Sequence, residues 1–283
     1  MLDDLNRELA GYVEIRRDGA VCEIRMVKPK VNAICPRLSY SIERAALYLQ
    51  DDADLRVGLL TSGCDRAFSA GLDFTKAGGG WDDEDGPRAS EGGFGGITTL
   101  WSLKKPLVAV INAPAIGGGL ELALSCDVIL MAEDAYFQLP ELERGLLPDG
   151  GGLQRLPRRI PYHVATAMIW TGERMSAADA LRWGLAYRVA PGAEIAAAGW
   201  ELARRMARSA PLAQQALKET LRAVDGLSDR AAMDLRRIAG ADLSCYRRML
   251  ASDDMIEGQR ASLEKRAPRW TGRPRGAQAD GAS

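Results

Sequence analysis

The feature that most restricts the fold is a strand, a glycine run, a helix and a second strand that follow one another over residues 106–132. The segment PLVAVINA is continuously apolar, which is typical of a parallel strand buried on both faces. Gly117, Gly118 and Gly119 come next, followed by the apolar helical stretch LELALSC and the strand DVILMA. Strands that alternate with helices in this way predict an α/β protein with parallel βαβ crossovers.

Segments nearer the N-terminus extend the same pattern. The segment YVEIRRDGAVCEIRM alternates on either side of Asp18-Gly19 and predicts a β-hairpin. We expect a helix over RLSYSIERAALYLQDD, a strand over VGLLTS and a short helix over ITTLWSLKKP. Residues 76–96 are rich in glycine and acidic residues, so they predict a mobile loop or lid within the domain.

The C-terminal third is different in character. From Ala177 onward the sequence predicts helices almost throughout, with Pro211 at the first position of one of them. The helical segments are SAADALRWG, EIAAAGWELARRMARSA, PLAQQALKETLRAV and DRAAMDLRRIAGADLSCYRRMLAS. We therefore divide the chain into an α/β core over residues 1–190 and a helical region over residues 191–283 that ends in a basic tail.

Composition excludes several classes of function. A formal net charge of −1 gives no reason to expect nucleic acid or an anionic membrane as partner. The five cysteines are scattered without C-x-x-C spacing, which argues against structural zinc and a disulfide framework and favours a reducing cytoplasm. The polar start predicts no signal peptide, and no apolar stretch is long enough to span a membrane. With His163 as the only histidine, acid–base catalysis would fall to carboxylates.

The glycine run itself suggests a site for negative charge. Three glycines before a helix leave backbone N–H groups open to a ligand, and the helix N-terminus adds a positive dipole end. No Lys-Ser or Lys-Thr pair follows, so this is not a Walker A loop, and Glu121 would repel a phosphate. Two interpretations stay open here. One is an oxyanion hole beside an acid–base carboxylate, and the other is close packing of helix on strand with Glu121 in solvent.

Further carboxylates follow in FQLPELERGLLPDGGGLQRLP. Glu141 comes after a proline, Glu143 lies two positions on, and Asp149 precedes a second glycine run. Two carboxylates in one semi-buried pocket tend to acquire separated pKa values, so that one serves as acid and the other as base. Sequence spacing alone does not show that Glu121 and Glu141 meet.

The segments AFSAGLDF, PLVAVINAPAIGGGLELALSCDVILMAEDAYFQLPE and GLLPDGGGLQRLPR resemble the crotonase (enoyl-CoA hydratase/isomerase) superfamily over roughly residues 10–270. Within it, GGFGGITTLWSLKKP and GERMSAADALRWGLAYRV are similar to carnitinyl-CoA dehydratase-like members. The resemblance implies a crotonase-like (ClpP/crotonase) spiral of ββα units with a C-terminal helical trimerisation region. It also implies an acyl-CoA thioester substrate, no separate cofactor because CoA is part of the substrate, and no metal.

The resemblance assigns roles to particular residues. The backbone amides of Leu72 and Gly118 would form the oxyanion hole, and Glu121 and Glu141 would be the catalytic acids. Asp149 stands where dienoyl-CoA isomerases carry a third acid and plain hydratases have glycine. The implied activity is that of an enoyl-CoA hydratase-type lyase. A double-bond isomerase and a non-catalytic acyl-CoA-binding member remain as alternatives.

The resemblance also implies where CoA binds and how the chain assembles. The CoA-binding candidates are Lys28, Lys30, Ala33, Ser69, Ala70, Gly71 and Asp73, with Lys265 or Arg266 reaching the phosphates from a neighbouring subunit. For a quaternary ammonium group, Trp81 is the aromatic candidate. The expected assembly is a homotrimer, or a hexamer made of two trimers.

Overall fold

The computed structural model describes residues 2–76, 89–235, 238, 242–273 and 275. The chain divides into two compact units. The larger unit comprises residues 1–103 and 107–204, and the smaller comprises residues 104–106 and 205–283. Part of the predicted lid, including Trp81, and the end of the basic tail lie outside the described residues.

The core of the larger unit is a six-stranded sheet in the order β1-β2-β3-β4-β6-β9. Its strands are β1 (Val13–Asp18), β2 (Val21–Met26), β3 (Val57–Ser62), β4 (Leu107–Ile111), β6 (Val128–Ala132) and β9 (Arg188–Ala190). β1 and β2 are antiparallel, with Asp18 opposite Val21, so the predicted hairpin is confirmed. Every other pair in this sheet is parallel, which agrees with the predicted crossovers.

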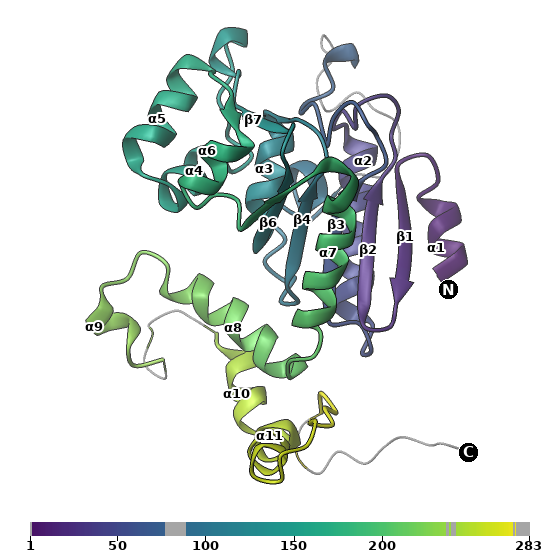
Figure 1. Cartoon of the computed structure of the whole chain (residues 1–283), viewed down its shortest axis with the longest axis vertical. Coiled ribbons are helices and arrows are strands. Elements are labelled where there is room, and N and C mark those ends of the chain that lie inside the picture. The colour runs from purple at the N-terminus through teal and green to yellow at the C-terminus, as the bar shows by residue number, and fades with distance from the viewer. Residues whose placement is uncertain (1, 77–88, 236–237, 239–241, 274, 276–283) are drawn as a thin grey trace. The chain divides into compact units, whose positions relative to one another are not determined.

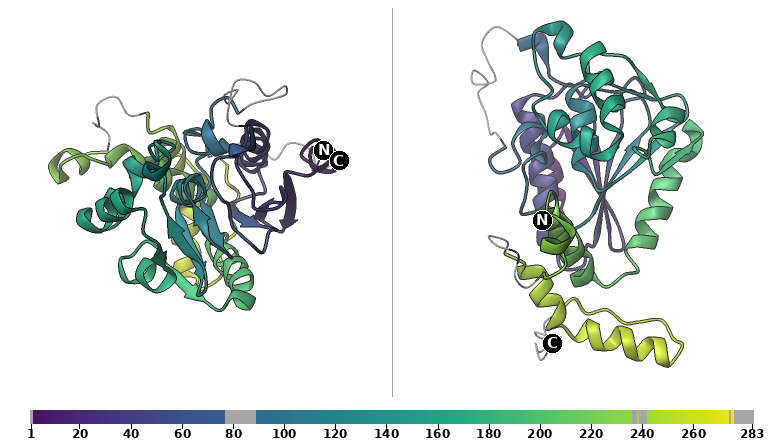
Figure 2. Two further views of the ribbon diagram at one scale, coloured as in Figure 1. Left: turned by 90° about the horizontal axis from the view of Figure 1, so that it is seen from above. Right: turned by 90° about the vertical axis from the view of Figure 1, so that its left-hand side faces the viewer.

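Helices cover both faces of this sheet (Figures 1 and 2). α2 (Pro36–Asp51) packs against the first three strands and buries Leu38, Ile42 and Leu49 on one stripe. Burying one such side chain stabilises the fold by about 1.5–3 kcal/mol. α7 (Gly192–Met206) crosses the other face, where a Cβ added to Gly199 would lie 2.6 Å from Cγ2 of Val110 in β4. α1 (Leu2–Glu8) precedes the first strand.

A second, small sheet has the order β5-β7-β8. Its strands are β5 (Ala115–Ile116), β7 (Tyr136–Gln138) and β8 (Met175–Ser176). α3 (Gly118–Ser125) begins directly after β5. The other helices of this region are α4 (Gly152–Arg159), α5 (Tyr162–Thr171) and α6 (Ala177–Arg182), with short 3-10 turns η1 (Phe74–Lys76), η2 (Phe94–Gly96) and η3 (Leu142–Arg144). The glycine run therefore lies at the junction of β5 and α3.

The smaller unit is helical among its described residues. Its helices are α8 (Pro211–Val224), α9 (Asp229–Ala232), α10 (Ser244–Leu250) and α11 (Asp253–Leu263). Pro211 begins α8, as predicted. Glu219 on α8 caps α10, because its carboxylate accepts hydrogen bonds from the Tyr246 N–H at 3.0 Å and from the Ser244 hydroxyl at 3.3 Å.

Two expectations about helices are wrong. The segment ITTLWSLKKP forms turns instead of a helix. The Thr98 hydroxyl donates to the Phe94 carbonyl at 2.7 Å and to the Gly92 carbonyl at 3.3 Å. A side chain thus bonds to backbone carbonyls and competes with the backbone hydrogen bonds of a helix. The stretch from Asp229 to Ser252 is not one helix either, since α9 ends at Ala232 and α10 begins at Ser244. The short strand β9 was not predicted.

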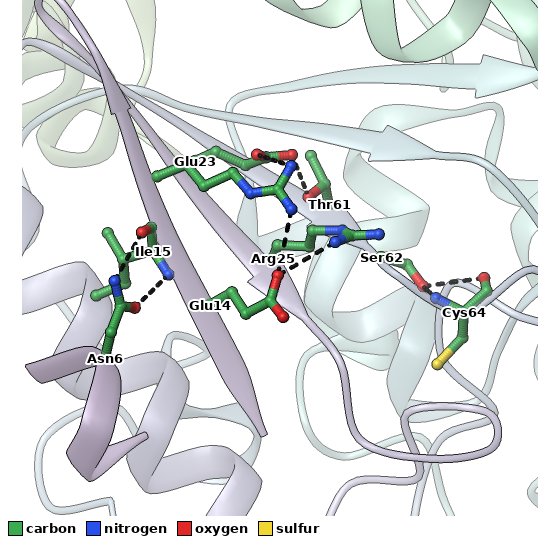
Figure 3. A network of polar contacts seen from close by, with 9 residues as sticks. Asn6, Glu14, Ile15, Glu23, Arg25, Thr61, Ser62 and Cys64 are labelled. Atoms are coloured by element: carbon green, nitrogen blue, oxygen red, sulfur yellow. Dashed lines mark hydrogen bonds and ion pairs between the residues drawn. The ribbon is translucent and has the colours of Figure 1, made fainter. Parts of the chain in front are cut away.

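A polar network joins the first three strands of the large sheet (Figure 3). Glu14 accepts from Arg25 at 3.1 Å, and Glu23 accepts from the Thr61 hydroxyl at 2.9 Å. Arg16 lies 3.9 Å from Glu23. Each member of this network has an interaction partner.

In the described part of the chain, no helix has both the length and the apolar character needed to cross a bilayer.

Candidate active site

The glycine run packs directly against the segment that contains Leu72. Ser69 and Ala115 form a parallel bridge, and the Ile116 N–H donates to the Ser69 carbonyl at 3.0 Å. Gly71 has φ +81°, and a Cβ there would lie 2.7 Å from the Ile116 carbonyl oxygen and 3.0 Å from the Gly118 nitrogen. A side chain at position 71 would therefore be strained and would separate the two segments.

The two amides predicted for an oxyanion hole belong to these neighbouring segments. Gly118 occupies the first turn of α3, and Leu72 is bridged in parallel to Ile34. Within the residues that the structure describes, neither the Leu72 N–H nor the Gly118 N–H donates a hydrogen bond. A backbone N–H group in a protein interior normally donates to an acceptor. Both amides are therefore available to donate a hydrogen bond to an acceptor atom of a ligand.

Glu121 is buried in the first turn of α3, with only 4% of its surface exposed. Its Oε1 accepts a hydrogen bond from the Gly152 N–H at 2.9 Å. Burial raises its pKa to about 7, and the negative charges of Glu141 and Asp149 act in the same direction. The Gly152 hydrogen bond and the charge of Arg155 oppose this rise. The interpretation of Glu121 as a solvated surface carboxylate is wrong.

Glu141 immediately precedes η3 and is partly buried. Its Oε1 lies over the glycine run, where a Cβ on Gly117 would be only 2.6 Å away. Its Oε2 is buried and has no hydrogen-bond partner in the described part of the chain. Burial raises the pKa of Glu141, as does the charge of Asp149, while Arg144 opposes them. Leaving a buried carboxylate oxygen unpaired is costly, so Oε2 is a position where a ligand donor would fit.

The structure thus brings the three predicted acids into one electrostatic group. Asp149 is exposed at the start of the loop that reaches Glu121 through Gly152. Its charge raises the pKa of both Glu121 and Glu141. Three carboxylates close enough to affect one another's charge favour proton transfer, because neighbouring acids resist simultaneous ionisation.

The predicted CoA-binding loops are tied together by an ion pair. Lys28 pairs with Asp73 and also donates to the Ala33 carbonyl at 2.9 Å. Burial alone would raise the pKa of Asp73, but Lys28 and hydrogen bonds from Thr75 outweigh it and lower the pKa. Lys30 is exposed on the same loop. These contacts hold the loop before α2 against the segment that supplies the Leu72 amide.

Ser69 has a different environment from the other CoA-binding candidates. It is fully buried, its hydroxyl donates to the Asn32 carbonyl at 2.8 Å, and it accepts from the Gly71 N–H at 3.2 Å. Its side chain is thus engaged with main chain and shapes the turn. Ala70 is partly exposed and Gly71 is buried.

Lys265 belongs to the smaller unit and is exposed, with φ +52°. Arg266 beside it pairs with Glu257 at 2.6 Å and with Glu264 at 2.5 Å. Of the two candidates for the CoA phosphates, Arg266 is therefore already neutralised by carboxylates.

Three residues near the site were missed by sequence reasoning. Phe94 lies over the glycine run. Glu43 anchors the loop that precedes Phe94 by accepting a hydrogen bond from the Gly92 N–H. Arg155 donates a hydrogen bond to the Thr98 carbonyl at 2.5 Å. A signal was present for Phe94, because a single aromatic residue between two glycine pairs in GGFGG indicates a close backbone approach.

His163 lies apart from the candidate site. It is exposed on α5 and lines an open cavity of about 360 Å³ together with Arg174 and Trp183. None of the predicted site residues lines that cavity. No cluster of three or more His, Cys, Asp or Glu residues suited to a metal ion occurs among the described residues.

Comparison with known proteins gives consistent matches. The enoyl-CoA hydratase/isomerase family profile matches residues 16–273. Carnitinyl-CoA dehydratase of Salmonella typhi is 43% identical over 263 residues, covering 92% of this chain and 98% of that relative. Its counterpart from Proteus mirabilis (strain HI4320) is 44% identical over 257 residues, covering 90% and 96%. The crystal structure of enoyl-CoA hydratase from Mycobacterium tuberculosis H37Rv matches with a TM-score of 0.83 at 33% identity, covering 93% of this chain and 99% of that one.

The fold and these matches define an α/β enzyme of the crotonase type, and the predicted fold class and enzyme class are confirmed. The chain belongs to the enoyl-CoA hydratase/isomerase family.

Proposed function

We propose that this protein is a hydro-lyase that adds or removes water across the α,β bond of an acyl-CoA thioester. One observation carries the proposal. Two carboxylates with raised pKa values, the buried Glu121 and the partly buried Glu141, lie at a glycine run whose Gly118 amide is open to an acceptor.

In the proposed mechanism the amides of Leu72 and Gly118 bind the thioester oxygen. Charge accumulates on that oxygen as the α,β bond gains or loses water through an enolate. A single oxyanion donor typically contributes about 3 kcal/mol, or roughly 10²–10³ in rate. The segments that carry both amides are held together by close contact between Gly71 and Gly118.

The two glutamates would divide the proton transfers. Glu141, whose Oε2 lacks a partner among the described residues, is the main proton-transfer group, and Glu121 holds and activates the water. A positioned acid or base contributes roughly 10²–10⁴ in rate. With a pKa of about 7, Glu121 is present in both protonation states near neutral pH. It can therefore serve hydration and dehydration alike.

The relatives suggest where to look for the substrate. Those reported above include two carnitinyl-CoA dehydratases and an enoyl-CoA hydratase. A β-hydroxyacyl-CoA or 2-enoyl-CoA is accordingly the proposed substrate class, with carnitinyl-CoA as one member. Asp149 favours a second candidate, double-bond isomerisation, because its charge acts on both glutamates.

An acyl-CoA panel tests the proposal. The purified protein is incubated with crotonyl-CoA, carnitinyl-CoA and a 3-enoyl-CoA, with ultraviolet absorbance for the enoyl thioester and mass spectrometry of the products. We expect a mass change of one water on at least one of the first two substrates. Migration of the double bond without a mass change would favour the isomerase. Saturable binding without any turnover would favour the non-catalytic alternative.

The proposal extends to CoA binding, assembly and location. Lys28, Lys30, Ala33 and the segment from Ser69 to Asp73 would contact the CoA moiety, with Lys265 of a neighbouring subunit near the phosphates. The assembly would be a homotrimer or a hexamer, which light scattering would measure. A cytoplasmic location is supported by the five cysteines, none of which forms a disulfide in the described part of the chain.

A further inference from the structure

Phe94 occupies the space between two glycines of the candidate site. A Cβ added to Gly118 would lie 2.4 Å from its Cζ and 2.5 Å from its Cε1. A Cβ added to Gly150 would lie 3.0 Å from its Cδ1. One edge of the ring therefore contacts both the helix start that carries the Gly118 amide and the loop that wraps Glu121.

Gly150 lies between the Phe94 ring and the carboxylate of Glu121. A Cβ on Gly150 would also lie 2.7 Å from Oε2 of Glu121. Phe94 and Glu121 thus face the same backbone position from different elements. Phe94 is only partly buried, so part of its surface is open to a ligand.

A buried carboxylate fixes the loop that carries this ring. Glu43 of α2 is 3% exposed. It accepts hydrogen bonds from the N–H groups of Ser90, Glu91 and Gly92 at 2.7, 2.8 and 3.0 Å. The Ser90 hydroxyl adds a fourth contact at 3.2 Å. Hydrogen bonds to a charged acceptor are stronger than neutral ones, so the start of the loop has little freedom.

The far side of the loop is fixed as well. The Gly95 N–H donates to the Ser39 hydroxyl at 3.0 Å, and Gly96 has φ +73°. A Cβ on Gly96 would lie 2.0 Å from the Ser39 carbonyl oxygen. Because the loop is held on both sides of Phe94, the backbone that carries the ring cannot move away without breaking these contacts.

We propose that Phe94 is a specificity-determining residue that excludes acyl groups with a substituent on the α-carbon. The proposal rests on the function given above. With the thioester oxygen at the Gly118 amide, the α-carbon is two bonds from that oxygen and would adjoin the ring edge that contacts Gly118. A methyl group on that carbon would compete with the ring for space. Linear 2-enoyl and β-hydroxyacyl thioesters would fit.

The test compares crotonyl-CoA with its α-methyl homologue, 2-methylcrotonyl-CoA. We expect the wild-type protein to prefer the linear substrate in kcat/KM. Phe94→Ala should shift this preference toward the branched one by roughly 10- to 200-fold, the range for one misfitting carbon. Phe94→Leu should give a smaller shift in the same direction. An unchanged preference in a folded Phe94→Ala variant would overturn the proposal.

A second pair of variants tests whether the loop anchor matters. Glu43→Gln keeps one acceptor oxygen but brings an NH₂ group against backbone donors, so it should relax the preference in the same direction as Phe94→Ala. Glu23→Gln is the matched control, a buried glutamate of β2 in the network of Figure 3, and should leave the preference unchanged. A shift in Glu23→Gln equal to that in Glu43→Gln would contradict the assigned role of the anchor.

Binding separates this inference from the proposed function. The dissociation constants of butyryl-CoA and 2-methylbutyryl-CoA need no turnover and are measured by calorimetry. A larger dissociation constant for 2-methylbutyryl-CoA than for butyryl-CoA in the wild type, with a smaller difference in Phe94→Ala, supports the inference even if no water is transferred. Equal affinities for both esters in both proteins overturn it, whatever the result of the activity panel.

Discussion

Two buried glutamates of the larger unit are nearly equal in exposure but opposite in their hydrogen bonding. Glu43 on α2 is 3% exposed and has four hydrogen-bond donors around its carboxylate. Glu121 on α3 is 4% exposed and accepts one hydrogen bond from a described residue, the Gly152 N–H. Because the two carboxylates are almost equally buried, the difference between them lies in the number of hydrogen-bond donors around each.

The comparison teaches how a carboxylate anchor differs from a carboxylate available for chemistry. A carboxylate that accepts several backbone hydrogen bonds is suited to holding a loop in place, because each bond ties one residue of the loop to it. A charge with few donors, close to other acids, has a raised pKa and can exchange a proton near neutral pH. Glu141 is of this second kind, since its pKa is raised and its buried Oε2 has no partner among the described residues.

The largest expected effect is the loss of activity in Glu141→Gln. If Glu141 transfers a proton, kcat should fall by roughly 10²–10⁴. The dissociation constant of a non-reacting acyl-CoA and the melting temperature should change little, because the amide preserves the shape and no anchoring contact is lost. Turnover and binding are measured on the same preparation. Wild-type turnover in this variant would remove Glu141 from the mechanism.

The next effect concerns Glu121 and pH. Its pKa is about 7 in the folded protein and about 4.5 when unperturbed, so the folded state holds its proton more tightly than the unfolded state does. The resulting stabilisation is fully present below pH 4.5 and is lost as the pH rises through 7. A rise from 4.5 to about 7 corresponds to about 3 kcal/mol at most.

Urea unfolding of the wild type and of Glu121→Gln between pH 5 and pH 8 measures this contribution. We expect the wild type to lose stability relative to the variant as the pH rises, since glutamine does not titrate. Parallel curves for the two proteins would mean that Glu121 is no more basic in the fold than in the unfolded chain.

A smaller effect is expected for the anchor. Glu43→Gln should lower the free energy of unfolding by about 1–3 kcal/mol, because one of the two oxygens that accept from interior backbone donors is replaced by an NH₂ group. Urea unfolding near neutral pH measures it, with Glu23→Gln as the control that retains an acceptor for the Thr61 hydroxyl. Equal stability losses in both variants would show that the donors around Glu43 carry no special weight.

The two glutamates were not equally predictable from sequence. Glu121 is three positions after Gly118, so its place at the glycine run follows from local helix geometry. The partners of Glu43 lie 47 to 49 residues further along the chain. Nothing in the amphipathic pattern of α2 indicates them. Phe94 had a local glycine signal, but its contact with Gly118 depends on the tertiary fold.

The same reasoning explains the successes and errors in the fold. The hairpin at Asp18-Gly19 and the helix after Gly117 rest on local chemistry, and both were predicted. The helix expected over ITTLWSLKKP had favourable periodicity, but the Thr98 hydroxyl contacts carbonyls of that turn. The proximity of Glu141 to Gly117 also depends on tertiary structure, so sequence spacing left it open.

The smallest effect extends the comparison to ion pairs, using Lys28–Asp73 and Arg247–Asp242. The side chains of Lys28 and Asp73 are 16% and 11% exposed, whereas those of Arg247 and Asp242 are 66% and 74% exposed. An exposed pair contributes about 0.2–1 kcal/mol, because water screens it. The shielded pair should therefore show the larger coupling energy in a double-mutant cycle with Lys28→Met and Asp73→Asn.

The coupling between Lys28 and Asp73 should also depend on pH. The pKa of Asp73 is lowered by Lys28, so the stabilisation should persist at neutral pH and be lost in acid as Asp73 takes up a proton. The coupling is obtained from urea unfolding at pH 7 and pH 3. Equal couplings for the shielded and exposed pairs would show that the Lys28–Asp73 contact does not hold the two loops, even though it lies beside the Leu72 amide.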